Sequence, residues 1–235
     1  MADLIPNSSF ENGWDGFNDG AGGLPHSVIA TDYAFDGTHS AKYAWTPNPG
    51  GDVGGIMYHS LGGGYDRVWT RIYFRLTTHI SSVWKYQRFQ TTGGGNFGGF
   101  FVQSGNTILS WGWDNEDQAI ATSIGLTEAR VCDGNWHMLE VDYQRNGGAS
   151  GFPEASFRFD GQPVYAELNG HSTITYWGAG NQSYWQNGRL IAGMRASTAK
   201  IGTIFWMGTL NANNTTTGQS NIDLIAASSS GWLGP

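Results

Sequence analysis

Short runs of alternating apolar and polar residues recur along the whole chain. They lie at 27–35, 40–46, 54–61, 67–76, 83–91, 97–104, 106–113, 119–124, 200–210 and 220–228. Glycine, asparagine, aspartate, serine and proline separate these runs. Because successive side chains of a strand point to opposite faces of its sheet, the runs predict many short β-strands joined by turns.

The stretch 133–146 shows this alternation most clearly. The side predicted to face the core carries His137, Leu139, Val141 and Tyr143. The opposite side carries Trp136, Met138, Glu140 and Asp142. A second alternating run follows at 154–164 and contains the turn dipeptide Asp160-Gly161, so the two runs predict consecutive antiparallel strands.

Helical periodicity is almost absent from the sequence. Only 125–132 and 186–197 have a pattern that can form a helical turn. Many strands with frequent turns are typical of an all-β fold. We therefore expect an antiparallel two-sheet β-sandwich or jelly roll, and the length of 235 residues suits a single domain over residues 1–235.

The composition indicates a folded chain with a large core. It includes 36 Gly, but also 11 Trp, 10 Tyr and 12 Phe, which supply ample apolar area to bury. Cys132 is the only cysteine, which excludes an intrachain disulfide and a cysteine-rich zinc site. We expect it to be a buried structural thiol.

The charge and the first residues narrow the class of protein further. The formal net charge of −7 argues against a nucleic-acid-binding protein, which normally carries a basic excess. The first residues show neither a basic start nor a long apolar run, so we expect no signal peptide and no membrane partner. The expected locations are a virion surface, or the outside of the cell after removal of a signal.

The run 67–76 places an apolar set on one face and a basic, aromatic set on the other. The apolar set is Val68, Thr70, Ile72, Phe74 and Leu76. The opposite set is Arg67, Trp69, Arg71, Tyr73 and Arg75. In the next run, the residues that share a face are Trp84, Tyr86, Arg88 and Gln90. If the two strands pair, the sheet presents a band of aromatic rings and guanidinium groups.

Such a band is suited to binding a glycan. Aromatic rings stack on the apolar faces of sugars, and guanidinium groups bind hydroxyls or carboxylates in a fixed geometry. The alternative is structural, with the rings packed under the long loop at 167–188 and the arginines paired with acidic side chains. Both interpretations stay open, because the sequence does not reveal the register between strands.

Two kinds of carbohydrate-active enzyme require different residues. A retaining glycosidase needs closely spaced carboxylates; Glu140 and Asp142 form only a pair, and a solvated or arginine-paired outer face is the favoured interpretation. A polysaccharide lyase needs a cation or amide to neutralise the uronate carboxylate, and a Tyr or His for proton transfer. The lyase candidates are Arg71, Arg88 and Gln90 for neutralisation, and Tyr73, Tyr86 and His137 for proton transfer.

Oxygen-bearing side chains gather at 111–118. Asp114, Asn115 and Asp117 are ligands of the kind that calcium takes, which makes them candidates for a structural calcium site. Their spacing does not match an EF-hand loop, so a polar turn between two strands is the favoured interpretation. We expect no other cofactor.

Six stretches, taken in order, resemble a known family. They are "LIPNSSFENGWDGF", "GTHSAKYAW", "VWTRIYFRL", "DGNWHMLEVDYQRN", "ASFRFDGQPV" and "NIDLIAASSSGWLGP". The resemblance is to the concanavalin A-like lectin/glucanase superfamily, covers nearly the whole chain and implies a concanavalin A-like jelly roll. This architecture serves lectins, laminin-G-like modules, glycosidases, polysaccharide lyases and virion surface proteins.

Two hypotheses about function follow. The first is a non-catalytic, lectin-like carbohydrate-binding or surface-interaction module, such as a virion decoration protein, whose partner is a glycan or a neighbouring subunit; a homo-oligomer would suit this role. The second is a polysaccharide lyase acting on a uronate-containing glycan. The lyase is favoured if its candidate residues converge in one open groove.

Overall fold

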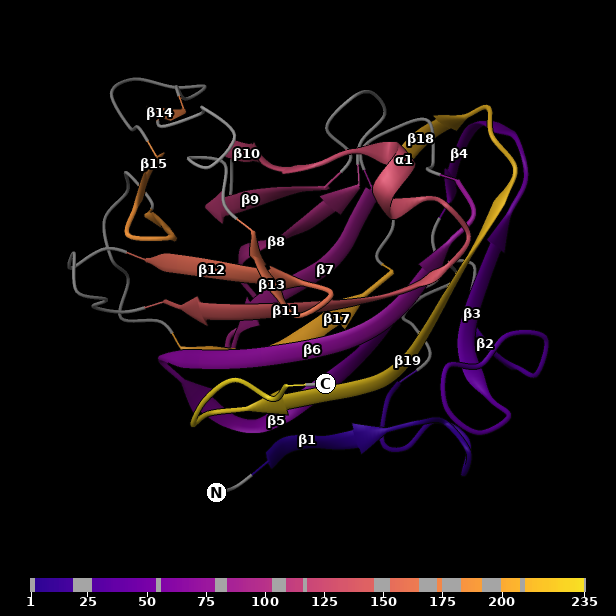
Figure 1. Ribbon diagram of the computed structural model, residues 1–235, viewed down its shortest axis with the longest axis horizontal. Helices are drawn as coiled ribbons and strands as arrows, with labels where there is room; N and C mark the ends of the chain where they lie inside the picture. The colour runs from indigo at the N-terminus through magenta and orange to yellow at the C-terminus, as the bar shows by residue number, and fades with distance from the viewer. Residues whose placement is uncertain are drawn as a thin grey trace.

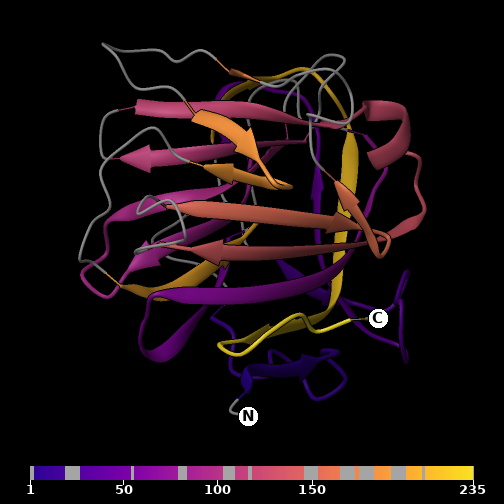
Figure 2. The same cartoon turned by 60° about the vertical axis from the view of Figure 1, so that its left-hand side comes forward.

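A computed structural model describes most of the chain. The described residues are 3–18, 27–53, 56–78, 84–102, 109–115, 118–145, 153–164, 173–174, 183–191, 200–207 and 210–234. Two antiparallel sheets dominate this part of the structure, and they stack face to face (Figures 1 and 2). The fold is therefore the β-sandwich that the sequence pattern predicts.

The larger sheet lies nearer the viewer in Figure 1. Its strands are β1 (Asp3–Ser8), β2 (Val28–Ala30), β3 (Ser40–Trp45), β6 (Arg67–Leu76), β11 (Trp136–Gln144), β12 (Glu154–Phe159), β13 (Gln162–Val164), β14 (Thr173–Ile174), β15 (Ser183–Gln186), β16 (Arg189–Ile191) and β19 (Gly218–Ser228). Their spatial order is β14-β15-β16-β12-β11-β6-β19-β3-β2, while β1 pairs with β19 and β13 with β12. Strand β6 thus lies near the middle of the sheet.

The smaller sheet lies behind β6, β11 and β12 in Figure 1. Its strands are β5 (Met57–Tyr65), β7 (Trp84–Thr91), β8 (Asn96–Val102), β9 (Leu109–Asn115), β10 (Gln118–Leu126) and β17 (Ile201–Trp206). They follow the order β10-β9-β8-β7-β17-β5. A separate pair joins β4 (Asn48–Val53) to β18 (Leu210–Asn214), and α1 (Glu128–Val131) is the one short helix among the described residues. No described helix has the length and apolar character needed to cross a membrane.

The core lies between the two sheets. The predicted apolar face of β6 is buried, from Val68 to Leu76, as expected. Phe74 of β6 contacts Tyr86 of β7, with ring centroids 5.6 Å apart, and Tyr143 of β11 contacts Phe89 of β7 at 5.0 Å. These contacts join the sheets, because each pair has one ring from either layer.

The predicted hairpin after 133–146 is confirmed. Strands β11 and β12 pair antiparallel, with Leu139 opposite Phe159. The turn that follows contains Asp160 at φ 50° and Gly161 at φ 76°. Backbone angles of this sign suit a tight hairpin turn, for which Asp-Gly is a favoured dipeptide.

The two predicted helical turns have different outcomes. The first is confirmed, because α1 lies within 125–132. The second is wrong where the structure describes it, since β15 and β16 form a hairpin with Gln186 opposite Arg189. The Asn187-Gly188 turn between them, with φ values of 52° and 73°, explains the error, because this dipeptide favours a two-residue hairpin loop.

The thiol of Cys132 differs from its predicted environment. It is half-buried at the margin of the core rather than enclosed in it. Its position directly after α1 places it where the chain leaves the core for an exposed turn.

Candidate functional site

The basic and aromatic row of β6 lies on the outer face of the larger sheet. The alternation is as predicted, because the intervening residues point into the core; these are Val68, Thr70, Ile72, Phe74 and Leu76. However, Trp69, Arg71 and Tyr73 are all buried, although they face away from the core. Other parts of the chain therefore cover this row.

Ion pairs hold one end of the row. Arg67 donates through Nε and Nη2 to the two carboxylate oxygens of Asp142, at 2.7 and 2.6 Å. Arg189 donates to Asp142 at 2.9 Å and to Glu154 at 2.6 Å. Two arginines and two carboxylates thus balance each other, and the hydrogen bond to Asp142 is the main reason that the pKa of Arg67 is raised. The arginine-paired interpretation of Asp142 agrees with this geometry.

The C-terminal segment covers the middle of the row. Arg71 donates hydrogen bonds to the Gly234 carbonyl and to Asn7 of β1. The Gly234 N–H donates to a carboxylate oxygen of Glu140, at 2.9 Å. Arg158 lies over the ring of Trp232, 4.2 Å from its centroid. Glu140 is therefore a buried anchor for the chain end, and not a solvated or catalytic carboxylate.

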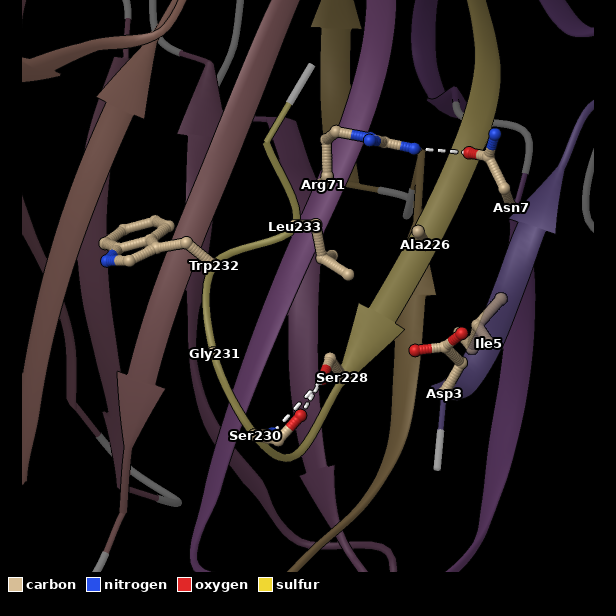
Figure 3. Close-up of a pocket in the computed structure, with 10 residues that line it drawn as sticks. All are labelled: Asp3, Ile5, Asn7, Arg71, Ala226, Ser228, Ser230, Gly231, Trp232 and Leu233. Atoms are coloured by element: carbon tan, nitrogen blue, oxygen red, sulfur yellow. Dashed lines mark hydrogen bonds between the residues drawn. The ribbon is translucent and has the colours of Figure 1, made fainter. Parts of the chain in front are cut away.

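A cavity of about 340 Å³ remains between this segment, β1 and β19. It is lined by Asp3, Ile5, Asn7, Arg71, Ala226, Ser228, Ser230, Gly231, Trp232 and Leu233. Figure 3 shows Arg71 reaching across to Asn7, while Trp232 turns away from the other side chains. Two guanidinium nitrogens of Arg71 already serve to fix the chain end and β1, through Gly234 and Asn7.

Aromatic side chains cover the other end of the row. The Phe35 ring stacks on Tyr73 with centroids 3.9 Å apart. The guanidinium of Arg75 lies 3.7 Å from the centroid of the Tyr33 ring. This half of the row therefore follows the structural interpretation, in which rings and arginines pack beneath other parts of the chain.

The expected band across β6 and β7 does not form. Strand β6 pairs with β11 and β19 in the larger sheet, whereas β7 pairs with β8 and β17 in the smaller one. Consecutive strands can change sheet in a sandwich, and the sequence gives no signal of this crossing. Arg88 and Gln90 are thus separated from the β6 row by the core, and Tyr86 lies within the core.

Tyr86 is fully buried in the core. Its hydroxyl forms a hydrogen bond of 2.8 Å with the Ser220 hydroxyl. Burial raises its pKa far above the ordinary value for tyrosine. A solvent-borne polysaccharide cannot reach this group, so the expected role of Tyr86 in binding or proton transfer is wrong for this conformation.

His137 lies on the inner side of β11, as its alternation predicts, near the end of the strand. Its ring stacks on Phe159 with centroids 4.9 Å apart. The two ring nitrogens contact Asp160 at 2.9 Å and Asp133 at 3.0 Å. The lyase candidates Tyr73, Tyr86, His137, Arg71 and Arg88 therefore do not converge.

Arg88 and Gln90 lie together on the outer face of the smaller sheet. Their neighbour Phe89 points into the core, and both are half-buried. Arg88 is opposite Phe205 of β17, and Gln90 is opposite Thr203. The next strand, β5, places Tyr58 opposite Phe205.

A transverse row results, which runs across four strands. It consists of Tyr58, Phe205, Arg88 and Gly99. The Tyr58 and Phe205 rings stack with centroids 5.0 Å apart and planes at 25°, and both are half-buried. Gly99 has no side chain and is buried, because β8 approaches the β7 backbone closely there. Two partly exposed rings next to a guanidinium can stack on a sugar and bind its carboxylate or hydroxyls.

The sequence contains only weak signals for Tyr58 and Phe205. Each lies in an apolar run, "GGIMYHSL" or "KIGTIFWMGTL", in which residues of both faces are apolar or aromatic. Alternation alone does not separate the two faces of such runs. Knowledge of the pairing of β7 with β17 would have been needed to find the row.

The calcium candidates and several other predictions lie outside the described side chains. Asp114 and Asn115 end β9, and Gln118 begins β10 opposite Asn115, so the two strands pair antiparallel there. Asp117, the side chain of Trp84 and most of the loop 167–188 lie outside the described part of the structure. Among the described residues, no three metal-ligating side chains form a group.

Comparison with known proteins shows that the fold of this chain is similar to that of several solved structures. No protein-family model matches the chain, and no curated protein matches it significantly. Among solved structures, endo-β-1,4-glucuronan lyase from the fungus Trichoderma reesei aligns with a TM-score of 0.60 at 16% identity, over 95% of this chain and 94% of the lyase.

Two further structures align over similar lengths. The cellulose-induced protein Cip1 gives a TM-score of 0.60 at 16% identity, over 97% of this chain and 98% of Cip1. A conserved carbohydrate esterase from the Shiga toxin-encoding bacteriophage phi24B gives 0.53 at 15% identity, over 96% of this chain and 97% of the esterase. At such identities these likenesses establish the jelly-roll sandwich and leave the activity to the residues.

Proposed function

We propose that the protein is a non-catalytic carbohydrate-binding module that takes a glycan across the outer face of its smaller sheet. The transverse row of Tyr58, Phe205, Arg88 and Gly99 carries the proposal. The stacked ring pair offers an apolar platform, and the neighbouring guanidinium offers a donor for a carboxylate. The names of the similar structures, a glucuronan lyase and a carbohydrate esterase, favour the same class of ligand.

The row favours an acidic glycan. A carboxylate bound by a guanidinium forms charge-assisted hydrogen bonds, which are about twice as strong as neutral ones. A glycan lying across the strands would set one ring on Tyr58 and Phe205 and bring the next toward Arg88.

The binding test compares the wild type with Arg88→Gln and Phe205→Ala in affinity gels. The gels contain polyglucuronate, alginate or a neutral β-glucan. We expect retention by a polyuronate that falls about ten-fold with either variant, because each removes an interaction worth about 1.4 kcal/mol. Arg158→Gln is the matched control, since Arg158 lies over Trp232 on the larger sheet. Absence of retention in every gel, or equal retention by all variants, would contradict the proposal.

A polysaccharide lyase is the second candidate, and the phenol of Tyr58 in the same row favours it. In β-elimination a base takes the C5 proton, the electron pair forms the C4–C5 double bond, the C4–O bond breaks and the leaving oxygen takes a proton. Tyr58 would transfer the proton, while Arg88 and Gln90 would neutralise the uronate carboxylate.

Tyr58→Phe separates the two candidates, because it keeps the ring and removes the hydroxyl. A lyase would produce the absorbance of unsaturated uronate from a polyuronate, and the variant would abolish this absorbance while retaining the polymer in the gel. Retention of the polymer without any absorbance by the wild type would favour the module and exclude the lyase.

A place on a virion surface, with neighbouring subunits as partners, is a further part of the proposal. Its support is the fold likeness to the bacteriophage esterase and the large proportion of glycine, 36 of 235 residues, in a chain without disulfides. Light scattering of the purified protein tests self-association. A monomer at all concentrations would contradict a role as a homo-oligomeric surface protein.

A further inference from the structure

A second, smaller cavity lies on the outer face of the larger sheet, next to the β12–β13 hairpin. Its volume is about 250 Å³, and it is lined by Tyr73, Trp136, Met138, Asp160 and Gly161. Pockets for drug-sized ligands typically span about 300–1,000 Å³, so this space suits a ligand of about one ring. It is separate from the transverse row, which belongs to the other sheet.

The aromatic rings of Tyr73 and Trp136 line this cavity, and Phe35 contacts both of them from beside it. Phe35 stacks on Tyr73 and meets Trp136 edge-on, with centroids 5.9 Å apart and planes at 64°. Phe35 is 44% exposed, which is unusual for so large an apolar side chain beside other rings. The Trp136 ring is half-buried. The rings of Phe35 and Trp136, which stand at a steep angle to each other, are therefore both partly exposed to solvent beside the cavity.

The Phe35 ring is held in position by a buried carboxylate. The backbone N–H groups of Phe35 and Asp36 both donate to one oxygen of Asp223, at 2.9 and 3.1 Å. Asp223 lies on β19, directly opposite Tyr73 on β6. The backbone at Phe35 is thus fixed before any ligand arrives, which lowers the entropy cost of binding.

Asp160 supplies a fixed acceptor at the edge of the cavity. One carboxylate oxygen accepts the Met138 N–H at 2.9 Å, and the other contacts Nδ1 of His137 at 2.9 Å. The side chain is still 44% exposed. Because a carboxylate has about four acceptor positions, about two remain for the hydroxyl groups of a ligand.

We propose that this cavity binds the pyranose ring of a neutral sugar. The ring of Trp136 contacts the apolar C–H face, and Asp160 accepts hydrogen bonds from two hydroxyls. The nearby carboxylates of Asp160 and Asp133 disfavour a uronate. The inference goes beyond the proposed function, because the site lies on the other sheet and selects a neutral ligand instead of an acidic one.

The test titrates the ¹⁵N-labelled protein with cellobiose, maltose, lactose and glucuronate, and follows two NMR signals. These are the indole N–H of Trp136, assigned with Trp136→Phe, and the amide of Gly161. We expect saturable shifts of both with a neutral disaccharide and none with glucuronate. Asp160→Asn should weaken the affinity about ten-fold, since it removes one charge-assisted acceptor.

Asparagine keeps the backbone of the turn, because it adopts positive φ readily, so Asp160→Asn should remain folded. Asp66→Asn is the control, because Asp66 pairs with Lys200 away from this cavity, and it should leave the sugar affinity unchanged. Absence of saturable shifts at millimolar disaccharide, or an affinity unaffected by Asp160→Asn, would overturn the inference. Retention of polyuronate in affinity gels should not change with Asp160→Asn, so failure here is distinct from failure of the transverse row.

Discussion

Arg67 and Asp142 form a bidentate ion pair between neighbouring strands, in which both carboxylate oxygens of Asp142 accept hydrogen bonds from one guanidinium. The Asp142 side chain is 1% exposed, and Arg189 donates to it from the other side. A buried carboxylate shared by two arginines holds β6, β11 and β16 in register. Its removal leaves Arg67 without this partner and Arg189 with Glu154 as its remaining carboxylate.

We therefore predict that Asp142→Asn lowers the free energy of unfolding by about 3 kcal/mol, the low end of values for broken buried pairs, because Arg67 is partly exposed. Urea unfolding followed by circular dichroism measures the change. Asp66→Asn is the matched control, because the Asp66–Lys200 pair is about half exposed on both sides and should contribute less than about 1 kcal/mol. Equal decreases in the free energy of unfolding for Asp142→Asn and Asp66→Asn would contradict the prediction.

Asp223 should give the stability a specific pH dependence. Burial raises its pKa from 3.8 to about 6, although three backbone N–H groups donate to it. The folded state therefore binds this proton more tightly than the unfolded state. The contribution of protonated Asp223 to the free energy of unfolding is therefore fully present below pH 3.8 and is lost as the pH rises through about 6.

Asp223→Asn isolates this contribution, because the amide does not titrate. We expect the free energy of unfolding of the wild type, minus that of the variant, to fall between about pH 4 and pH 6. The subtraction cancels the contributions of groups whose pKa shifts in the opposite direction. One such group is Glu11, whose pKa is lowered to about 2 by its hydrogen bond to His39. Parallel curves for the two proteins would show that Asp223 has an ordinary pKa.

The alternation along several strands was sufficient to predict which of their sides faces the core, as it is for β6 and β11. The inward side of β6 and the hairpin from β11 to β12 follow from a period of two residues, which the sequence displays directly. The same period correctly separated Glu140 and Asp142 from the core side of β11. Local chemistry also predicted the Asp160-Gly161 turn.

The sequence was insufficient to predict the candidate site, because that depends on which strands pair. Arg88 and Tyr86 are two residues apart, yet Arg88 faces outward and Tyr86 is buried in the core. The register of β7 against β8 shifts between Lys85 and Gln87, which breaks the alternation at Tyr86. A bulge of this kind leaves no clear trace in residue types.

Gly99 is required by the close approach of β8 to β7. A Cβ atom at this position would lie 2.0 Å from the carbonyl oxygen of Gln87 and 3.0 Å from the Arg88 Cα. Both are backbone atoms, so neither can move without shifting a strand. Gly99→Ala should therefore destabilise the protein by about 2 kcal/mol or more.

Thermal unfolding of Gly99→Ala and Gly231→Ala checks this prediction. At Gly231 an added Cβ meets no atom within 4 Å, so the control should unfold close to the wild-type temperature. A Gly99→Ala protein as stable as this control would indicate that β7 and β8 lie further apart than described. The transverse row would then need a different geometry around Arg88.

The hydroxyl of Tyr86 should matter for stability and not for binding. It forms a hydrogen bond with Ser220 between the two sheets, and its loss leaves a buried hydroxyl without this partner. Tyr86→Phe should lower the free energy of unfolding by about 1–2 kcal/mol. The double variant with Ser220→Ala should lose less than the sum of the single changes, because both partners are then absent.

Affinity gels with polyuronate complete this test, because they separate a structural role of Tyr86 from a functional one. Retention should be the same for Tyr86→Phe and the wild type at a temperature where both are folded. A folded Tyr86→Phe protein that no longer binds would mean that the core opens to admit the glycan. In that case the working surface would include the interior side of β7, and the transverse row would be only its outer margin.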